Sequence, residues 1–159
     1  MKTQRRRRKE GKTDYGARLA LLKSGKTRVV IRKSNRYLLV QLVESDNAQD
    51  NVIARVSSED LFGKGWPKER AGSLKSLAAA YLTGFMLGKK FKGKIKEAVL
   101  DIGLQRNVGG SRIYATLKGI LDAGLNVVHN PEALPSMERI KENKKISETF
   151  EKIKESLGK

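Results

Sequence analysis

An excess of positive charge constrains this chain more than any other feature of its sequence. The 159 residues contain 34 Lys and Arg against 17 Asp and Glu, a formal net charge of +17. Such a charge makes the compact state repel itself unless a polyanion neutralises it. Residues 131–159 hold seven basic and six acidic residues, which leaves 27 basic and 11 acidic residues, or +16, in residues 1–130. The surface that binds a polyanion is therefore predicted on the N-terminus and the body of the fold.

Two polyanions compete as partners of such a surface, an anionic membrane and a nucleic acid. The longest apolar run covers residues 77–87 and already contains Tyr81, Thr83 and Gly84, whereas a helix that spans a bilayer needs about 20 apolar residues. No apolar segment follows the charged start of the chain, so the start does not match a secretory signal. These observations favour nucleic acid as the partner and predict no membrane contact.

The residue pattern gives little support to catalysis. The chain has no cysteine, which excludes disulfides, thiolate zinc sites and cysteine nucleophiles. His129 is the only histidine and falls in a predicted loop. Asp101 falls on a predicted strand, where a nuclease places a metal-binding carboxylate, but such a site needs further carboxylates around the metal, and Glu97 and Asp122 complete no obvious cluster. We predict no enzyme activity, no metal, no cofactor and no small-molecule substrate, with a metal-dependent nuclease as one alternative.

The hydrophobic period changes along the chain and predicts a mixed α/β fold. Stretches with a period of two predict a three-stranded antiparallel meander at residues 28–33, 37–43 and 51–57, with a polar loop at 44–50. Helices are predicted between Asp14 and Gly25, at residues 73–90 and at 112–123. Strands at 95–102 and 126–128 extend the meander into a mixed sheet with helices packed on one face. Gly84 and Gly88 lie inside a predicted helix, where we interpret them as positions of close packing.

The chain is predicted to divide into a basic, nucleic-acid-binding arm at residues 1–12, a nucleic-acid-binding α/β domain at 13–130 and a partly helical C-terminal tail at 131–159. In the tail, Ile146, Phe150, Ile153 and Leu157 are spaced by four, three and four residues. This spacing is the apolar stripe of an amphipathic helix, which packs either on the body or on a neighbouring molecule.

The second face of the sheet is predicted to be a contact surface. If the side chains of Val29, Ile31, Leu38, Val40, Leu42, Val52, Ala54 and Val56 point inward, their neighbours along each strand point outward. The outward set then contains Arg28, Arg32, Arg55 and Tyr37. Tyr37 and Trp66 are candidates for stacking on unpaired bases, with Trp66 as a loop plug in the alternative.

Two further segments carry donors for phosphate. Residues 5–8 are four consecutive arginines, and Lys9 and Lys12 follow them; the arginine guanidinium binds phosphate bidentately and stacks on bases, which lysine does not. A solvated arm or a nuclear-import signal is the alternative. The loop before the last body helix offers a hydroxyl, amides and guanidiniums beside a helix N-terminus that Ser111 is predicted to cap. Its candidates are Gln105, Arg106, Asn107, Ser111 and Arg112.

An ordered set of motifs resembles the family of large-subunit ribosomal protein eighteen in its archaeal form. No single motif is sufficient to indicate the family, but the motifs follow one another in the order and at the spacing typical of it, from about residue 5 to residue 140. They are the arginine-rich arm with Gly11-Lys12-Thr13-Asp14-Tyr15, then Arg18-Leu19-Ala20-Leu21-Leu22-Lys23-Ser24-Gly25, Lys33-Ser34-Asn35-Arg36, Ala79-Ala80-Tyr81-Leu82-Thr83-Gly84, Ala98-Val99-Leu100-Asp101-Ile102-Gly103-Leu104, Leu117-Lys118-Gly119 and Asp122-Ala123-Gly124-Leu125.

This resemblance implies a structural role in the large ribosomal subunit, in the cytoplasm. The family binds 5S ribosomal RNA, attaches it at the central protuberance, and contacts 23S ribosomal RNA and neighbouring ribosomal proteins. It carries RNA contact onto the arm, the hairpin region and the loop, which here hold Arg5, Arg6, Arg7, Arg8, Lys9, Lys12, Arg28, Arg32, Lys33, Ser34, Asn35, Arg36, Gln105, Arg106, Asn107, Ser111 and Arg112. Arg55 joins these RNA-binding candidates as an outward residue of the third predicted strand. A DNA-binding architectural protein is the second alternative.

Overall fold

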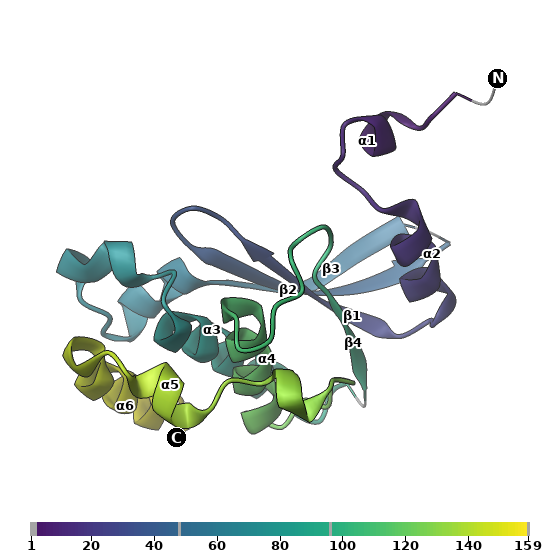
Figure 1. Ribbon diagram of the computed structural model, residues 1–159. Helices are drawn as coiled ribbons and strands as arrows, with labels where there is room; N and C mark the ends of the chain where they lie inside the picture. The colour runs from purple at the N-terminus through teal and green to yellow at the C-terminus, as the bar shows by residue number, and fades with distance from the viewer. Residues whose placement is uncertain (1–2, 48, 96, 159) are drawn as a thin grey trace.

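A four-stranded mixed sheet forms the centre of the fold in this computed structural model, which describes residues 3–47, 49–95 and 97–158 (Figure 1). The strands are β1 (Thr27–Lys33), β2 (Leu38–Asp46), β3 (Gln49–Ser57) and β4 (Ala98–Asp101), in the spatial order β3-β2-β1-β4. β1, β2 and β3 form an antiparallel meander, and β4 pairs with β1 in parallel. The predicted mixed α/β class and the meander are confirmed, and the parts of our predictions that fall on residues 1, 2, 48, 96 and 159 lie outside the described residues.

Alternation along β1 and β2 places the predicted apolar set in the core. Val29, Ile31, Leu38, Val40 and Leu42 are all fully buried. The predicted loop at 44–50 is wrong, because β2 and β3 continue through most of it and join in a tight turn at Asn47, whose φ of 47° lies in the left-handed region. Asparagine tolerates this conformation better than other non-glycine residues.

A β-bulge corrects the predicted orientation of one strand residue. Leu42 pairs with Ala54, but Val43 pairs with Val52, so the register shifts and Ile53 is the extra residue. An extra residue reverses the sides to which the preceding side chains point. Val52 was predicted to be in the core and is 48% exposed instead.

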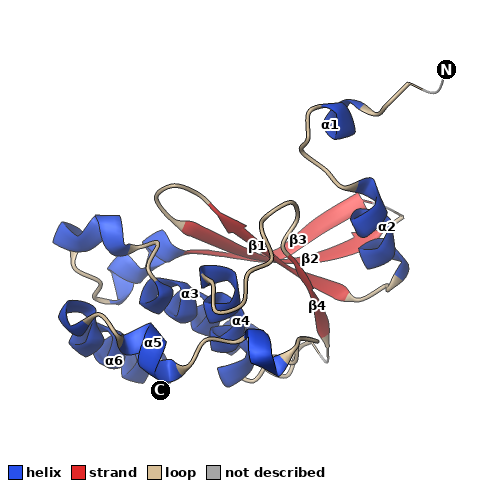
Figure 2. Cartoon of the chain, in the orientation of Figure 1, coloured by secondary structure: helices blue, strands red, loops and turns tan. Residues whose placement is uncertain are grey.

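Two long helices cover one face of the sheet, as predicted (Figure 2). They are α3 (Leu77–Phe91) and α4 (Arg112–Asp122). α3 begins later than predicted because the Ser76 side chain accepts a hydrogen bond from the Ala79 amide and caps the helix at that point. The preceding residues form two 3-10 segments, η1 (Ser58–Lys64) and η2 (Lys68–Ser73).

Glycines allow α3 and α4 to touch along their backbones. A methyl group added at Gly84 would lie 2.0 Å from the Thr116 carbonyl oxygen, and one added at Gly119 would lie 2.1 Å from the Tyr81 carbonyl oxygen. At Gly88 the nearest atom would be the Ala123 methyl at 2.6 Å. The interpretation of Gly84 and Gly88 as close-packing positions is confirmed.

The C-terminal helix packs back onto the body. The segment after α4 contains η3 (Pro131–Ala133), α5 (Met137–Lys141) and α6 (Lys144–Gly158). Ile146, Phe150 and Ile153 are buried, and the centre of the Phe150 ring lies 5.4 Å from the centre of the Tyr81 ring of α3. The predicted stripe is confirmed, and its partner is this chain's own α3.

Two shorter elements differ from their predicted extent. The predicted strand at 95–102 is reduced to β4, and 126–128 forms only an isolated bridge between Val127 and Ala98. On the N-terminal side, α1 (Arg6–Lys9) and α2 (Tyr15–Lys23) precede the sheet, and the Asp14 carboxylate caps α2 through the Gly16 and Ala17 amides. Among the residues that the structure describes, none of the helices has the length and apolar character that crossing a bilayer requires.

Candidate nucleic-acid interface

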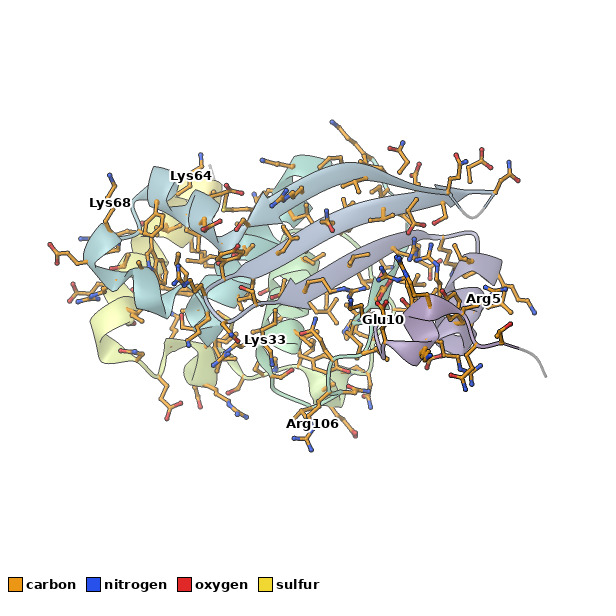
Figure 3. The ribbon with its side chains drawn as sticks, turned by 90° about the horizontal axis from the view of Figure 1, so that it is seen from above. Arg5, Glu10, Lys33, Lys64, Lys68 and Arg106 are labelled. Atoms are coloured by element: carbon orange, nitrogen blue, oxygen red, sulfur yellow. The ribbon has the colours of Figure 1, made fainter. Side chains whose placement is uncertain are left out.

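The three predicted contact segments project from the same side of the molecule. Figure 1 shows the arm with α1, the hairpin loop between β1 and β2, and the loop between β4 and α4 on the side of the sheet opposite α3 and α4. We call the sheet face on this side the outer face. In the view onto it, Arg5, Lys33 and Arg106 represent the three segments (Figure 3). Residues from three distant parts of the sequence are therefore available to one large ligand.

The arm is exposed throughout its described length, from residue 3 onward. Its contacts are weak ones: Arg6 and Lys12 pair with Glu10 at 3.7 and 2.9 Å, and the Arg7 Nε donates to the Thr13 hydroxyl at 2.9 Å. Exposed ion pairs of this kind contribute at most about 1 kcal/mol. Phosphate therefore competes easily for the cations of Arg5, Arg6, Arg7, Arg8, Lys9 and Lys12.

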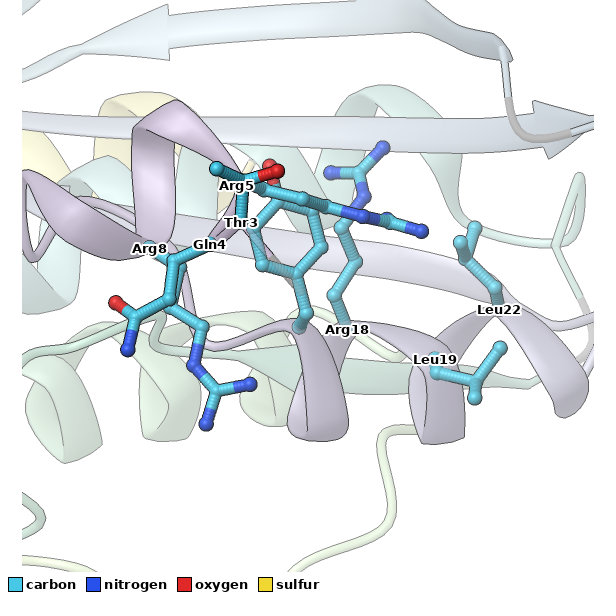
Figure 4. Close-up of a pocket in the computed structure, with 8 residues that line it drawn as sticks. Thr3, Gln4, Arg5, Arg8, Arg18, Leu19 and Leu22 are labelled. Atoms are coloured by element: carbon cyan, nitrogen blue, oxygen red, sulfur yellow. The ribbon is translucent and has the colours of Figure 1, made fainter. Parts of the chain in front are cut away.

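The arm and α2 enclose a cavity of about 610 Å³, shown in Figure 4. The Arg5 guanidinium lies 4.8 Å from the centre of the Tyr15 ring, a cation–π contact that holds this part of the arm near α2. Arg8 and Arg18 also line the cavity, together with Leu19 and Leu22 of α2. The structure thus collects guanidiniums from the arm and from α2 around a single opening.

The tip of the first hairpin presents exposed cations on a fixed turn. Lys33, Asn35 and Arg36 are exposed. Ser34 is exposed too, but its hydroxyl is already used within the turn: it donates to the Tyr37 carbonyl and accepts from the Arg36 and Tyr37 amides. Ser34 therefore shapes the turn, and Lys33 and Arg36 supply its charge.

Arg28 does not lie on an accessible surface, which corrects its predicted role. Its side chain is only 3% exposed, and its guanidinium donates to the carboxylates of Asp101 and Asp50 at 3.2 and 2.6 Å. It also donates to the Ser45 hydroxyl at 2.8 Å. A buried cation needs such partners, because an unpaired buried charge costs several kcal/mol. Arg28 therefore joins β1, β4 and the β2–β3 hairpin instead of facing a ligand.

Arg32 and Arg55, unlike Arg28, keep the exposure that was predicted for outward-facing residues of the sheet. The Arg32 side chain is 41% exposed, and it donates to the Asp101 carboxylate and to the carbonyls of Asp101 and Ile31. These bonds fix the guanidinium beside Gly103, at the base of the β4–α4 loop. Arg55 is exposed on β3.

Asp50 makes the stability of this network sensitive to acid. Burial alone raises the pKa of Asp50, but hydrogen bonds from Ser45 and Arg18 and the charges of Arg28 and Arg18 outweigh it, so the pKa of this carboxyl lies below its ordinary value. A depressed carboxyl pKa stabilises the fold above the unfolded-state pKa of about 4, and this stabilisation is lost as the pH falls through the folded-state pKa.

Asp50→Asn is therefore expected to cost more stability at about pH 6 than at about pH 3, because at the lower pH the carboxyl of the unfolded chain is largely protonated and the stabilisation from the lowered folded-state pKa is reduced. Urea unfolding of both proteins at the two pH values measures the difference. Asp46→Asn is the matched control, because Asp46 lies in the same hairpin and forms no ion pair with the described residues. If the free energy of unfolding of Asp50→Asn differs from that of the wild type by as much at about pH 3 as at about pH 6, the prediction is contradicted.

The loop between β4 and α4 is fixed to the sheet while its charge remains exposed. The Gln105 amide donates to the Ile31 carbonyl at 2.9 Å, and Asn107 accepts a hydrogen bond from the Tyr114 hydroxyl. Arg106 is exposed and Arg112 is half-buried. Gln105 and Asn107 therefore position the loop, and the two arginines supply its charge.

Ser111 is at the predicted N-cap position of α4, but its side chain does not cap the helix. Its hydroxyl oxygen is buried and has no hydrogen-bond partner among the described residues. The chain direction is set instead by Gly110, which has a φ of 66° and donates its amide to the Ala133 carbonyl. The predicted cap is thus wrong in its chemistry and right in its position.

Two arginines near these segments were missed by the sequence analysis. Arg18 of α2 pairs with Asp50 at 3.0 Å and lines the cavity beneath the arm. Arg139 of α5 lies beside the β4–α4 loop, where a methyl group added at Gly110 would be 2.8 Å from its Nη1. Arg18 was recognisable as a helical residue next to the arm, but no sequence signal places Arg139 beside Gly110.

The groups considered for catalysis have structural partners. The Asp101 carboxylate binds Arg28, Arg32 and the Gly103 amide, as expected of a residue that holds the following loop. The His129 ring nitrogen Nδ1 lies 2.7 Å from the Val127 carbonyl. Within residues 3–47, 49–95 and 97–158, the structure places no three His, Asp or Glu side chains where they could hold a metal ion.

Comparison with known proteins identifies the fold family. The family described as "Ribosomal large subunit proteins 60S L5, and 50S L18" matches residues 1–98 and 92–130 of this chain. The chain belongs to this family. It is 49% identical over 151 residues to large ribosomal subunit protein uL18 of Korarchaeum cryptofilum, covering 94% of this chain and 75% of the relative. It is 48% identical to uL18 of Aeropyrum pernix, covering 86% of this chain and 63% of the relative.

A third relative extends over almost the whole of both chains. uL18 of Methanococcoides burtonii is 43% identical over 161 residues, covering 96% of this chain and 91% of the relative. Membership makes the chain a structural component of the large ribosomal subunit in the cytoplasm and not an enzyme. The resemblance drawn from the motifs is thereby confirmed, and the nuclease alternative has no support among these relatives.

Proposed function

We propose that this chain binds 5S ribosomal RNA and attaches it to the large subunit at the central protuberance, where it also contacts 23S ribosomal RNA and neighbouring ribosomal proteins. In this proposal residues 1–12 are an RNA-binding arm, residues 13–130 an RNA-binding α/β domain and residues 131–159 a helical tail that closes the body. No cofactor, metal or small-molecule substrate takes part.

The observation that carries the proposal is the arrangement of cations around the outer face. Arg5, Arg8, Lys33, Arg36 and Arg106 come from three segments, and none of them forms an ion pair with the described residues. A folded RNA offers phosphates over a surface of comparable extent, and structured RNA is recognised mainly through shape, phosphate and 2′-hydroxyl contacts. The arrangement therefore suits a large folded RNA better than a short or linear anion.

A competition experiment at one fixed salt concentration tests the proposal. We expect a 5S RNA transcript to displace a labelled 5S RNA from the full chain far more effectively than duplex DNA of equal length does, because non-specific charge binding alone does not distinguish the two strongly. Equal competition by duplex DNA would favour a DNA-binding architectural protein. Mg²⁺-dependent cleavage of the RNA that Asp101→Asn abolishes would favour the nuclease.

A further inference from the structure

A cavity of about 480 Å³ lies between the first hairpin and the 3-10 segments, away from the arm. Ligand pockets in proteins have volumes of about 300–1,000 Å³, so this one has room for a nucleotide. The hairpin contributes Asn35, Arg36 and Tyr37 to its walls. The opposite wall consists of Glu59, Phe62, Ala71, Gly72, Leu74 and Lys75.

The two walls are held at a fixed separation by buried contacts. The Leu38 amide, next to Tyr37, donates to the hydroxyl of Ser58, which is fully buried at the start of η1. On the hairpin side, the Tyr37 backbone is hydrogen-bonded to Ser34 through both its amide and its carbonyl. On the other side, Leu61 and Trp66 are buried and anchor η1 in the core. The cavity is therefore largely formed before any ligand binds.

Trp66 is not available for stacking, in contrast to one of the two predicted options. It is 2% exposed, and its indole nitrogen donates to the Arg70 carbonyl, so it plugs the loop. Tyr37 and Phe62 are half-buried and both face the cavity as lining residues. Aromatic side chains that line an open pocket are typical of sites where an unpaired RNA base stacks.

The charges around the cavity favour a nucleotide. Arg36 and Lys75 are exposed and form no ion pair with the described residues. Glu59 is the acidic lining residue; a carboxylate accepts hydrogen bonds, so it suits the amino group of a base and not a phosphate. Lys64 and Lys68 lie at the same end of the molecule, opposite Arg5, as Figure 3 shows. The cationic surface thus continues beyond the three predicted segments.

We infer that this cavity receives one unpaired base of ribosomal RNA, which stacks on Tyr37 and Phe62 while Arg36 and Lys75 bind the adjacent phosphates. The inference rests on the proposed function and adds a base-recognition site to it. The base belongs either to 5S or to 23S ribosomal RNA, since both offer the same stacking surface and phosphates.

Two substitutions at one position test the stacking. Tyr37→Leu removes the ring and keeps an apolar side chain, whereas Tyr37→Phe keeps the ring and removes the hydroxyl. We expect Tyr37→Leu to weaken binding to the RNA that supplies the base by about 5- to 100-fold, the range for one stacked base, and Tyr37→Phe to bind within about twofold of the wild type. Thermal unfolding of both variants shows whether the hairpin is intact.

Chemical probing of base reactivity locates the base, with a 5S transcript alone in one arm and the 5S–23S assembly in the other. The expected result is one or two bases that the wild type and Tyr37→Phe protect and that Tyr37→Leu leaves reactive, while protection elsewhere is unchanged. Identical protection by all three proteins on both RNAs overturns the inference. Equal weakening by both substitutions also overturns it, because the contact is then made by the hydroxyl. Failure of the wild type to bind 5S RNA overturns the proposed function instead.

Discussion

Gly84→Ala or Gly119→Ala is expected to destabilise the fold by about 3 kcal/mol, although alanine is the better helix former by about 1 kcal/mol. The added methyl groups would lie 2.0 and 2.1 Å from the carbonyl oxygens of Thr116 and Tyr81. Those atoms belong to the backbone of the facing helix, so no side-chain rotation relieves the overlap. α3 and α4 must separate, and the loss of their packing exceeds the gain in helix propensity.

Gly158→Ala is the matched control, because Gly158 is the last residue of α6 and a methyl group there meets nothing within 4 Å. This substitution is expected to leave stability unchanged or slightly higher. Urea or thermal unfolding of the three variants provides the comparison. An unfolding midpoint of Gly84→Ala equal to that of the wild type would contradict the prediction, because it would mean that the space between α3 and α4 accommodates the methyl group.

The core of the fold was predictable because it depends on local patterns. The period of two placed Val29, Ile31, Leu38, Val40 and Leu42 on one face of the sheet, and all five are buried. The stripe in the tail predicted an amphipathic helix in the same way. These patterns report which side of an element is apolar, and an apolar side has only one stable place, in the interior.

Contacts between distant residues were not predictable by the same means. Arg28 is buried because Asp50 and Asp101 meet it, and they lie 22 and 73 residues away in the sequence. Val52 points outward because one extra residue enters β3, which the alternating pattern of 51–57 does not reveal. Arg139 reaches the β4–α4 loop only because the tail folds back past it. Each of these outcomes depends on tertiary pairing and not on the local sequence.

In the candidate interface too, one aspect was predictable from the local sequence and another depended on tertiary contacts. The location of the charge was predictable from composition, because the arm, the hairpin tip and the loop carry exposed cations in the fold. The role of each polar side chain in this interface was not predictable from the sequence. Ser34, Gln105 and Asn107 were predicted to contact RNA, and the structure uses their polar atoms to fix the turn and the loop. Their proposed contribution to binding is therefore to hold Arg36 and Arg106 in place.

The arm is expected to have the largest effect on RNA binding. Replacing Arg5, Arg6, Arg7 and Arg8 with glutamine keeps the length of the arm and removes four charges. Each neutralised phosphate contributes about −0.7 to −0.9 to the slope of log affinity against log salt, so the slope is expected to become shallower by about 3. Because the electrostatic contribution is small near 1 M salt, a change of this size weakens binding by up to about 1,000-fold at about 0.1 M.

A second variant with the same loss of charge separates arm contacts from net charge. Lys89, Lys90, Lys141 and Lys152 belong to α3, α5 and α6, in the helical layer on the far side from the outer face. Replacing these four lysines with glutamine is expected to leave the salt slope close to that of the wild type, since no phosphate contact is lost. Filter binding of a 5S transcript across a salt series measures both slopes. If the two variants flatten the slope equally, the chain binds RNA through its overall charge and the outer face is not the interface; if neither does, the arm never touches the RNA.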